Sequence, residues 1–257
     1  LRTVESEFGP SQVEFTFHPT PGLESADLMM LFRSMVKQVC RRHGYHATFM
    51  CQPGIPGIFC SGWHLHQSLV SRETGDNLFI PEADADLLSP LGRQFVAGIL
   101  QHAPAGSVFS TPTINGYKRY KPNSLAPDRT IWGRDNKGAM VRAVGGVGDK
   151  GSRIENRIGD PAANPYLYLA SQLLAGLDGI ERGLAPPPPT DDPYAADATP
   201  LPRNLMDAVR ALRADSFFKG AMGDRFVDYI AYLKEMEIER FLATVTDWEH
   251  REYFELF

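Results

Sequence analysis

The feature that most constrains this chain is the order of its apolar patterns, in which alternating and helical segments follow one another irregularly. Val13–Phe17 alternates polar and apolar residues, the period of a half-buried strand. Ser25–His43 instead repeats apolar residues at helical spacing. Ser25 or Asp27 is placed to cap the start of this helix, and Gly44 to end it. Since no regular strand–helix–strand repeat follows, the order predicts an α+β domain over a doubly wound sheet.

Further elements are predicted along the rest of the chain. Strand patterns occur at Tyr45–Gln52, Gly62–Ser71, Thr130–Trp132 and Ala139–Val144, and helical patterns at Leu91–His102, Asn164–Arg182 and Asn204–Phe257. A long Gly-, Asn- and Arg-rich region separates the two central helices, and such a segment inside a compact domain is usually functional or disordered. The proline-rich stretch Ala185–Pro202 predicts a polyproline-like surface connection.

Composition narrows the class of protein. A chain of 257 residues can bury a core as one large domain or two small ones. Its net charge of −5 gives no electrostatic reason to expect nucleic acid or an anionic membrane as partner. Three cysteines are too few for a disulfide framework and favour a reducing cytoplasm. No apolar run approaches the roughly 20 residues that span a bilayer.

A pair of carboxylates near the start of the chain is the first candidate site. Glu7 and Glu14 flank the turn-forming segment 9–12, and two carboxylates separated by a tight turn can converge on one cation. The alternative is a pair of solvated surface charges. Glu14 lies in an apolar strand pattern, where burial would require a partner or a metal ion.

Two histidines form the second candidate site. His64 and His66 lie on a predicted strand, so both imidazoles face one side while Leu65 faces the other. Together with oxygen ligands such residues suit Mn²⁺ or Mg²⁺, whereas a nitrogen-rich set suits zinc. Histidines with a purely structural role are the alternative.

A dense group of basic residues is the third candidate site. In an otherwise acidic chain, the cations gather at Asn115–Arg119, Arg134, Lys137, Arg142, Lys150, Arg153 and Arg157. Alternation places Arg153, Glu155 and Arg157 on one strand face. Arginine forks bind phosphate and carboxylate groups bidentately. The carboxylate between them is either their salt-bridge partner or a metal ligand beside an anion site, and a solvated basic loop is the remaining alternative.

The three groups together predict a polyanion held by arginines, with divalent cations bridged by carboxylates. This is the equipment of phosphoryl transfer, in which positioning and charge neutralisation dominate catalysis. Neither a GxxxxGK[ST] loop nor the glycine-rich loop and partner motifs of protein kinases occurs in the chain. The residues alone therefore predict a metal-dependent ATP or phosphate enzyme.

The order of several motifs resembles the glutamine synthetase family. The matching stretches are EFGPSQVEF (7–15), SGWHLHQSL (61–69), NGYKRYKPNSLAP (115–127), RIENRIGDPAANPYLYLA (153–170) and LLAGLDGI (173–180). The resemblance implies that residues 1–257 form one catalytic domain, a curved and mainly antiparallel sheet flanked by helices. The family's small N-terminal β-grasp domain would precede Leu1, so we expect an N-terminally truncated chain.

The resemblance also implies roles for individual residues. Glu7 and Glu14 match ligands of the metal ion that activates the side-chain carboxylate of glutamate, and His64 and Glu155 match ligands of the metal ion at the ATP phosphates. The implied nucleotide-binding residues are His66, Ser68, Arg142, Lys150 and Arg153, and the implied glutamate-binding residues are Arg119, Arg157 and Cys60, with Arg119 and Arg142 also catalytic. Two or more Mg²⁺ or Mn²⁺ ions per site are implied, with ATP as substrate.

The implied activity is glutamine biosynthesis. The γ-carboxylate of glutamate attacks the γ-phosphate of ATP, and ammonia then displaces phosphate from γ-glutamyl phosphate. Metal ions and arginines suit the first step because both reactants are anions. The family forms stacked homo-oligomeric rings in which a neighbour's N-terminal domain completes each site. We therefore expect the isolated chain beginning at Leu1 to be inactive.

Departures from the family pattern leave the acceptor open. Leu125 stands where ammonia-using members place a flap glutamate, and Lys137 stands where an arginine is expected. Trp63 and Leu125 would make the amine end of the site less polar. The alternatives are a γ-glutamyl ligase for an organic amine and a non-catalytic nucleotide-binding fragment. An alkyl or aryl amine is our hypothesis for Leu125, because each buried methylene contributes about 0.8 kcal/mol.

Overall fold

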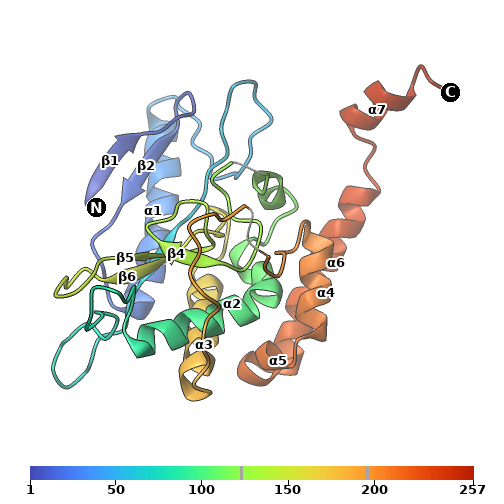
Figure 1. Ribbon diagram of the computed structural model, residues 1–257. Helices are drawn as coiled ribbons and strands as arrows, with labels where there is room; N and C mark the ends of the chain where they lie inside the picture. Colours follow the sequence, from blue (N-terminus) through green and yellow to red (C-terminus); the bar gives the residue numbers. More distant parts are fainter. Residues whose placement is uncertain (122–123, 195–196) are drawn as a thin grey trace.

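The computed structural model describes residues 1–121, 124–194 and 197–257 (Figure 1). Its strands are β1 (Thr3–Ser6), β2 (Val13–Thr16), β3 (Leu65–Gln67), β4 (Trp132–Arg134), β5 (Val141–Val144) and β6 (Arg153–Asn156). Its helices are α1 (Gly22–Arg42), α2 (Pro90–Ser110), the 3₁₀ helix η1 (Gly116–Arg119), α3 (Pro165–Glu181), α4 (Leu205–Ala214), α5 (Ser216–Met222), α6 (Asp224–Leu242) and α7 (Asp247–Tyr253). None of the helices in these residues is long and apolar enough to cross a membrane.

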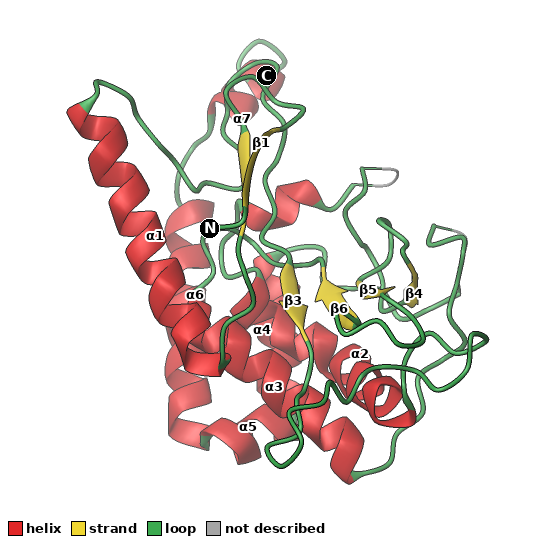
Figure 2. Ribbon diagram, turned by 90° about the vertical axis from the view of Figure 1, so that its left-hand side faces the viewer, coloured by secondary structure: helices red, strands yellow, loops and turns green. Residues whose placement is uncertain are grey.

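The strands form a four-stranded sheet and a separate hairpin. The sheet has the order β3-β6-β5-β4, with β6 antiparallel to both of its neighbours and β4 parallel to β5. Figure 2 shows these strands side by side above α2 and α3. The hairpin pairs β1 with β2 in antiparallel register. The predicted α+β class, with a mainly antiparallel sheet, is confirmed.

Alternation along β5 and β6 separates the core from the polar face of the sheet. Val141, Ala143 and Ile154 are buried against apolar residues of α2 and α3. Because successive side chains point to opposite faces, Arg142 and Glu155 lie on the face away from these helices. Arg142 and Glu155 are also register partners, so their side chains are cross-strand neighbours. The helical layer thus positions a row of charged side chains.

Two glycines let α2 and α3 touch backbone to backbone. A Cβ atom at Gly98 would lie 2.0 Å from the carbonyl oxygen of Ala175, and one at Gly179 would lie 2.1 Å from that of Gln94. No side chain larger than hydrogen fits at either distance. This contact fixes the spacing of the helices beneath the sheet.

A buried histidine joins three elements on the far side of α2. His102 of α2 lies with its Nε2 atom 2.8 Å from Asp178 of α3 and its Nδ1 atom 3.8 Å from Asp215, which caps α5. Its ring stacks on Phe217 with a centroid distance of 3.9 Å. Burial alone would lower the pKa of His102, but the two carboxylates of Asp215 and Asp178 outweigh it and raise the pKa above its ordinary value.

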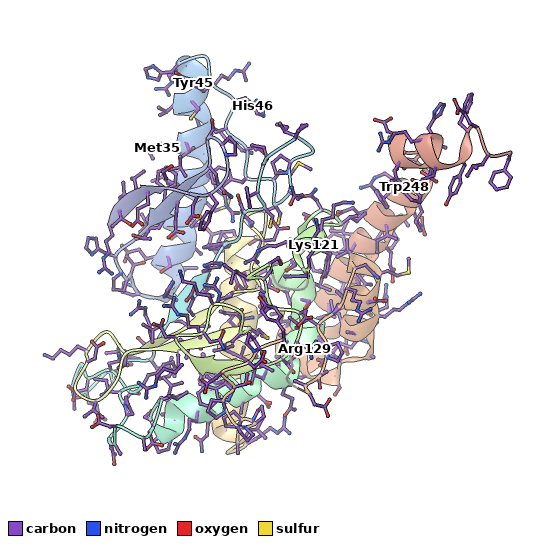
Figure 3. The ribbon with its side chains drawn as sticks, turned by 45° about the horizontal axis from the view of Figure 1, so that its top comes forward. Met35, Tyr45, His46, Lys121, Arg129 and Trp248 are labelled. Atoms are coloured by element: carbon purple, nitrogen blue, oxygen red, sulfur yellow. The ribbon has the colours of Figure 1, made fainter. Side chains whose placement is uncertain are left out.

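Helix α1 packs on the hairpin through a few aromatic rings. Phe32 contacts Phe15 and Phe17 at centroid distances of 4.9 and 5.1 Å. Other apolar residues of the helix, including Leu31 and Met35, are exposed. Figure 3 shows Met35 on this outlying part of the molecule and Trp248 of α7 on a separate projection.

Two predicted strands differ from the structure in more than their boundaries. The strand predicted for Tyr45–Gln52 is wrong, because these residues form no strand. Instead, the backbone N–H group of Gln52 donates to Asn115 Oδ1 at 2.8 Å, and Asn115 Nδ2 donates to the carbonyl oxygen of Gln52 at 3.0 Å. The side chain of Asn115 thus makes the backbone hydrogen bonds that a neighbouring strand would make. The strand predicted for Gly62–Ser71 is shorter in the structure, where only β3 (Leu65–Gln67) forms and an irregular loop follows β3.

Other boundaries are displaced. Helix α1 begins at Gly22, and neither Ser25 nor Asp27 caps it, since Ser25 Oγ bonds Thr20 and Asp27 accepts from Tyr166. Helix α2 continues well beyond the predicted end at His102, with Pro104 inside it. Strand β4 starts two positions later than predicted, at Trp132, and β5 starts at Val141.

The remaining predictions agree with the structure where it describes them. The helix predicted for Asn164–Arg182 is α3, capped by Asn164, and the C-terminal portion is helical. The described residues of the proline-rich connection contain no helix and no extended strand. Trp132 Nε1 donates to the carbonyl oxygen of Pro187 at 2.7 Å, which holds the connection against β4. Residues 195–196 of this connection, and residues 122–123 of the 115–127 motif, lie outside the described residues.

Candidate active site

Glu155 is the centre of the polar face of the sheet. It is only 2% exposed, and its Oε1 atom accepts from Arg157 Nη1 at 2.5 Å and lies 3.0 Å from His64 Nδ1. Its Oε2 atom accepts from Arg142 Nη1 at 2.9 Å. A buried carboxylate must be paired, and here two arginines and an imidazole share that role.

Electrostatics define the protonation states of this group. Burial alone would raise the pKa of Glu155, but the hydrogen bond from His64 and the charge of Arg157 hold it below its ordinary value. Burial lowers the pKa of His64 to about 4, so the imidazole is neutral at pH 7. A neutral imidazole donates from one nitrogen only, so Nδ1 donates to Glu155 and Nε2 accepts from Arg119, at 3.2 Å. In this structure the lone pair of Nε2 is therefore engaged by the guanidinium group of Arg119.

A second histidine extends the row across β3. His66 is the register partner of Glu155, and its Nε2 atom lies 4.0 Å from the carboxylate. Its Nδ1 atom accepts from Arg153 Nε at 3.0 Å. Both histidines therefore lie on the face of Glu155, as the alternation predicts. On the other side of the row, Arg142 also pairs with Asp135, a residue that sequence reasoning missed.

Arg119 and Arg157 lie together at the end of the row. Arg119 is 6% exposed and donates from Nη1 to the carbonyl oxygen of Arg157 at 2.9 Å. Arg157 donates from Nε to the carbonyl oxygen of Lys137 at 2.8 Å. A Cβ atom at Gly62 would lie 2.7 Å from Arg119 Nη2, so this glycine makes room for the guanidinium group. The sequence signal for Gly62 was its place just before the two histidines.

Glu7 and Glu14 form a separate pair on the hairpin. Partial burial and the neighbouring carboxyl group of Glu7 raise the pKa of Glu14. Glu14 as a whole residue is exposed, so the condition under which its strand position would require a partner or a metal ion is not met. Gln12 ties the turn to the body by donating from Nε2 to the carbonyl oxygen of Cys60 at 3.2 Å and to Ser61 Oγ at 2.9 Å.

The donor chemistry of both pairs suits a divalent cation. Glu7 with Glu14 offers carboxylate oxygens without an arginine between them, and His64 with Glu155 offers an imidazole and a carboxylate. The charge of Glu155 contributes to the raised pKa of Glu14. In the part of the chain that the structure describes, no three His, Cys, Asp or Glu side chains are grouped as one metal site. The ligand roles of these four residues stay predictions.

Other predicted site residues lie at the edges of this arrangement. Ser68 follows β3, and Lys150 lies in the loop before β6, where its carbonyl oxygen accepts from Asn77 at 3.0 Å. Cys60 is partly buried beside the hairpin turn. The ring of Trp63 packs on Tyr168 of α3, with a centroid distance of 5.2 Å. The expected role of Trp63 at the amine end of the site stays a prediction.

Leu125 lies close to Arg119 along the chain. Ser124 Oγ donates to the carbonyl oxygen of Arg119, at 3.3 Å. Leu125 itself has φ 57°, in the left-handed region, and its side chain is 52% exposed. An apolar side chain is therefore presented to solvent next to the loop of Arg119.

Comparison with known proteins identifies the class to which this fold and site correspond. Residues 1–253 match the family model described as the glutamine synthetase catalytic domain. The chain belongs to the glutamine synthetase family, and the resemblance noted in the sequence is confirmed.

Individual relatives include both glutamine synthetases and an amide synthase. A gamma-glutamylanilide synthase from Acinetobacter sp. is 50% identical over 269 residues, covering 100% of this chain and 54% of that protein. A glutamine synthetase from Thermus thermophilus is 36% identical, covering 98% of this chain and 58% of that protein. The chain thus spans somewhat over half the length of these relatives.

Two solved structures are similar in fold. GmaS without ligand has a TM-score of 0.81 and 38% identity, covering 91% of this chain and 54% of that one. A GmaS/ADP complex has a TM-score of 0.84 and 34% identity, covering 96% of this chain and 60% of that one.

Proposed function

We propose that the protein is an ATP-dependent ligase that forms a γ-glutamyl amide from glutamate and ammonia through γ-glutamyl phosphate. The observation that carries this proposal is the row of His66, Glu155 and Arg142 across three strands, with Arg157 and Arg119 at its end. Several fixed cations around one buried carboxylate suit the capture of anionic reactants. Membership of the glutamine synthetase family supports the same reaction.

Each half of the site would act on a different reactant. Arg119 and Arg157 would hold the carboxylates of glutamate, with Cys60 beside them. The phosphates of ATP would lie along His66 and Arg142, and the nucleotide would extend to the residues at the loop end of the sheet, namely Ser68, Lys150 and Arg153. Two anions brought together in this way repel less because the arginines neutralise part of their charge.

Divalent cations would complete the charge balance. Glu7 and Glu14 would hold one Mg²⁺ or Mn²⁺ ion, and His64 with Glu155 would hold another. When bound, such ions polarise phosphoryl oxygens and neutralise charge that develops during transfer. We further propose a cytoplasmic location and a homo-oligomeric ring as the working form.

An organic amine is the second candidate acceptor, and Leu125 is the observation that favours it. A half-exposed leucine at this place offers apolar surface and no negative charge. Ammonium is small and strongly hydrated, so its capture requires anionic groups that replace water. The relative from Acinetobacter is named for an anilide product, which is consistent with this candidate.

The test is acceptor-dependent phosphate release by the full-length protein with ATP and glutamate. Ammonia and a series of alkyl and aryl amines are compared at matched free-base concentration, for the natural sequence, Leu125→Glu and its neutral match Leu125→Gln. The glutamate side chain should shift the specificity constant towards ammonia by up to about tenfold, the effect of one charged contact of about 1.4 kcal/mol, and glutamine should not.

The outcomes separate the candidates. If ammonia has the highest specificity constant in the natural sequence, the organic-amine candidate is withdrawn. If no acceptor supports phosphate release, the proposed ligase activity itself is wrong. An unchanged acceptor ratio in Leu125→Glu would show that this residue does not face the acceptor.

A further inference from the structure

A tyrosine far along the chain reaches the loop that carries Leu125. The backbone N–H group of Leu125 donates to Tyr194 Oη at 3.1 Å. Leu125 has φ 57°, a backbone conformation that residues with a Cβ atom rarely adopt. Such a conformation persists only where the surroundings impose it, and the tyrosine hydroxyl group is the contact that holds the amide of this residue.

Tyr194 is itself fixed to the sheet. The segment before it runs along β4, where the Thr190 N–H group donates to the carbonyl oxygen of Trp132 at 2.9 Å, and Asn136 Nδ2 donates to that of Thr190 at 3.2 Å. At Gly138, a Cβ atom would lie 3.2 Å from Tyr194 Oη. The hydroxyl group thus lies beside Gly138, where it and Pro193 leave little room for a Cβ atom.

The hydroxyl group of Tyr194 lies between two segments that contact the arginines of the candidate site. On one side, Ser124 links the Leu125 loop to the carbonyl oxygen of Arg119. On the other, Lys137 precedes Gly138, and its carbonyl oxygen accepts from Arg157 Nε at 2.8 Å. A change at this hydroxyl group would therefore move Leu125 relative to both arginines.

We propose that Tyr194 is a positioning residue that latches the Leu125 loop over the acceptor side of the site. Through this bond it sets how tightly the acceptor is held and how well water is excluded. The inference deepens the proposed ligase function and rests on it for the identity of the acceptor side. Tyr194 does not touch the reacting atoms in this role; it acts through the backbone of Leu125.

The latch has a chemical consequence for the acyl phosphate. When the loop is held, the amine nitrogen attacks the carbonyl carbon and gives up one proton to solvent. The bond from that carbon to the phosphate oxygen breaks, and amide and phosphate form in equal amounts. When the loop is free, water attacks the same carbon and the same bond breaks, so glutamate and phosphate are released. A loosened latch therefore raises phosphate release above amide formation.

The experiment uses Tyr194→Phe in the full-length protein, with Tyr166→Phe as matched control. Tyr166 also donates one hydroxyl hydrogen bond, to Asp27 at 2.6 Å, but it lies on α3. Amide hydrogen exchange without substrates should accelerate at Leu125 by about tenfold or more in Tyr194→Phe, because the amide loses its acceptor. With substrates, the KM for the acceptor and the ratio of phosphate to amide should rise, while the KM for ATP stays unchanged. The control should show none of these changes.

Failure of the latch and failure of the ligase function are distinguishable. Unchanged exchange at Leu125 would overturn the latch whatever the activity. Faster exchange with an unchanged acceptor KM and phosphate ratio would overturn its role in the reaction. If the natural sequence shows no glutamate-dependent phosphate release, the ligase proposal and the reaction role both fall, while the exchange result still decides whether the bond forms.

Discussion

The two halves of the candidate site are built in opposite ways. In the sheet half, Glu155 is buried and bonded to His64, Arg142 and Arg157. In the hairpin half, Glu7 and a mostly exposed Glu14 carry like charges side by side. One half is neutralised by the protein itself, whereas the other has an excess of negative charge. The difference indicates that the sheet is organised before any ligand arrives and that the hairpin gains most from a cation.

The largest expected effect comes from comparing the two carboxylates directly. Glu155→Gln leaves two arginines near a neutral amide in a buried place, and losing one partner of a buried ion pair typically costs about 3–5 kcal/mol. Glu14→Gln removes a repulsion at the surface and should change stability by less than about 0.5 kcal/mol. Urea unfolding curves with a common slope measure both. Equal losses of stability would contradict the division into two halves.

An intermediate effect is expected at the arginine end of the sheet half. Arg119→Lys or Arg157→Lys replaces a bidentate fork by a point charge. Glutamate binding should weaken by about 1.5–3 kcal/mol, the range for a hydrogen bond to a charged group. ATP binding should weaken much less. Calorimetric titration of each ligand in the full-length protein measures this, and equal losses for both would assign these arginines to the phosphates or to the fold.

The smallest effect concerns the helical layer under the sheet half. Since the pKa of His102 is raised on folding, its stabilising contribution is full below the ordinary histidine pKa of about 6.5 and is lost as pH rises through the higher folded value. Pairing with His102 lowers the pKa values of Asp178 and Asp215, so the stabilising contribution of these two carboxylates is lost in acid. Arg182, directly after α3, also pairs with Asp178 and keeps its charge throughout.

His102→Gln should therefore remove a pH-dependent part of stability of about 1 kcal/mol between pH 6 and pH 9. The exposed His46, at the end of α1 in Figure 3, provides the matched control His46→Gln. Thermal unfolding across this pH range measures the difference between the two variants. A pH profile of His102→Gln identical to that of the control would show that the pair does not couple the helices.

Local pattern predicted much of the sheet half, because alternation alone places His64 with His66, and Arg153 with Glu155. It could not predict that Arg142 pairs with Asp135, since this contact depends on the register of β5 and on a turn with a positive φ value at Asp135. The failed strand at Tyr45–Gln52 has a similar cause. Its apolar pattern is strand-like, but the side chain of Asn115 takes the backbone partners that a strand would have offered.

Tyr194 lies outside every motif that the sequence presented, and its contact with Leu125 spans a long stretch of chain. Such contacts depend on how loops cross, which apolar periodicity does not encode.

The backbone contact between α2 and α3 limits how the sequence can change. Gly98 and Gly179 lie in the interior of long helices, where alanine is normally the better residue. Here a single methyl group at either position would collide with a carbonyl oxygen and push α3 away from α2. A saturation scan would therefore show two intolerant positions in the supporting layer, on the face of the sheet opposite the charged row. Substitutions that adapt the active-site loops to new acceptors must therefore leave Gly98 and Gly179 unchanged.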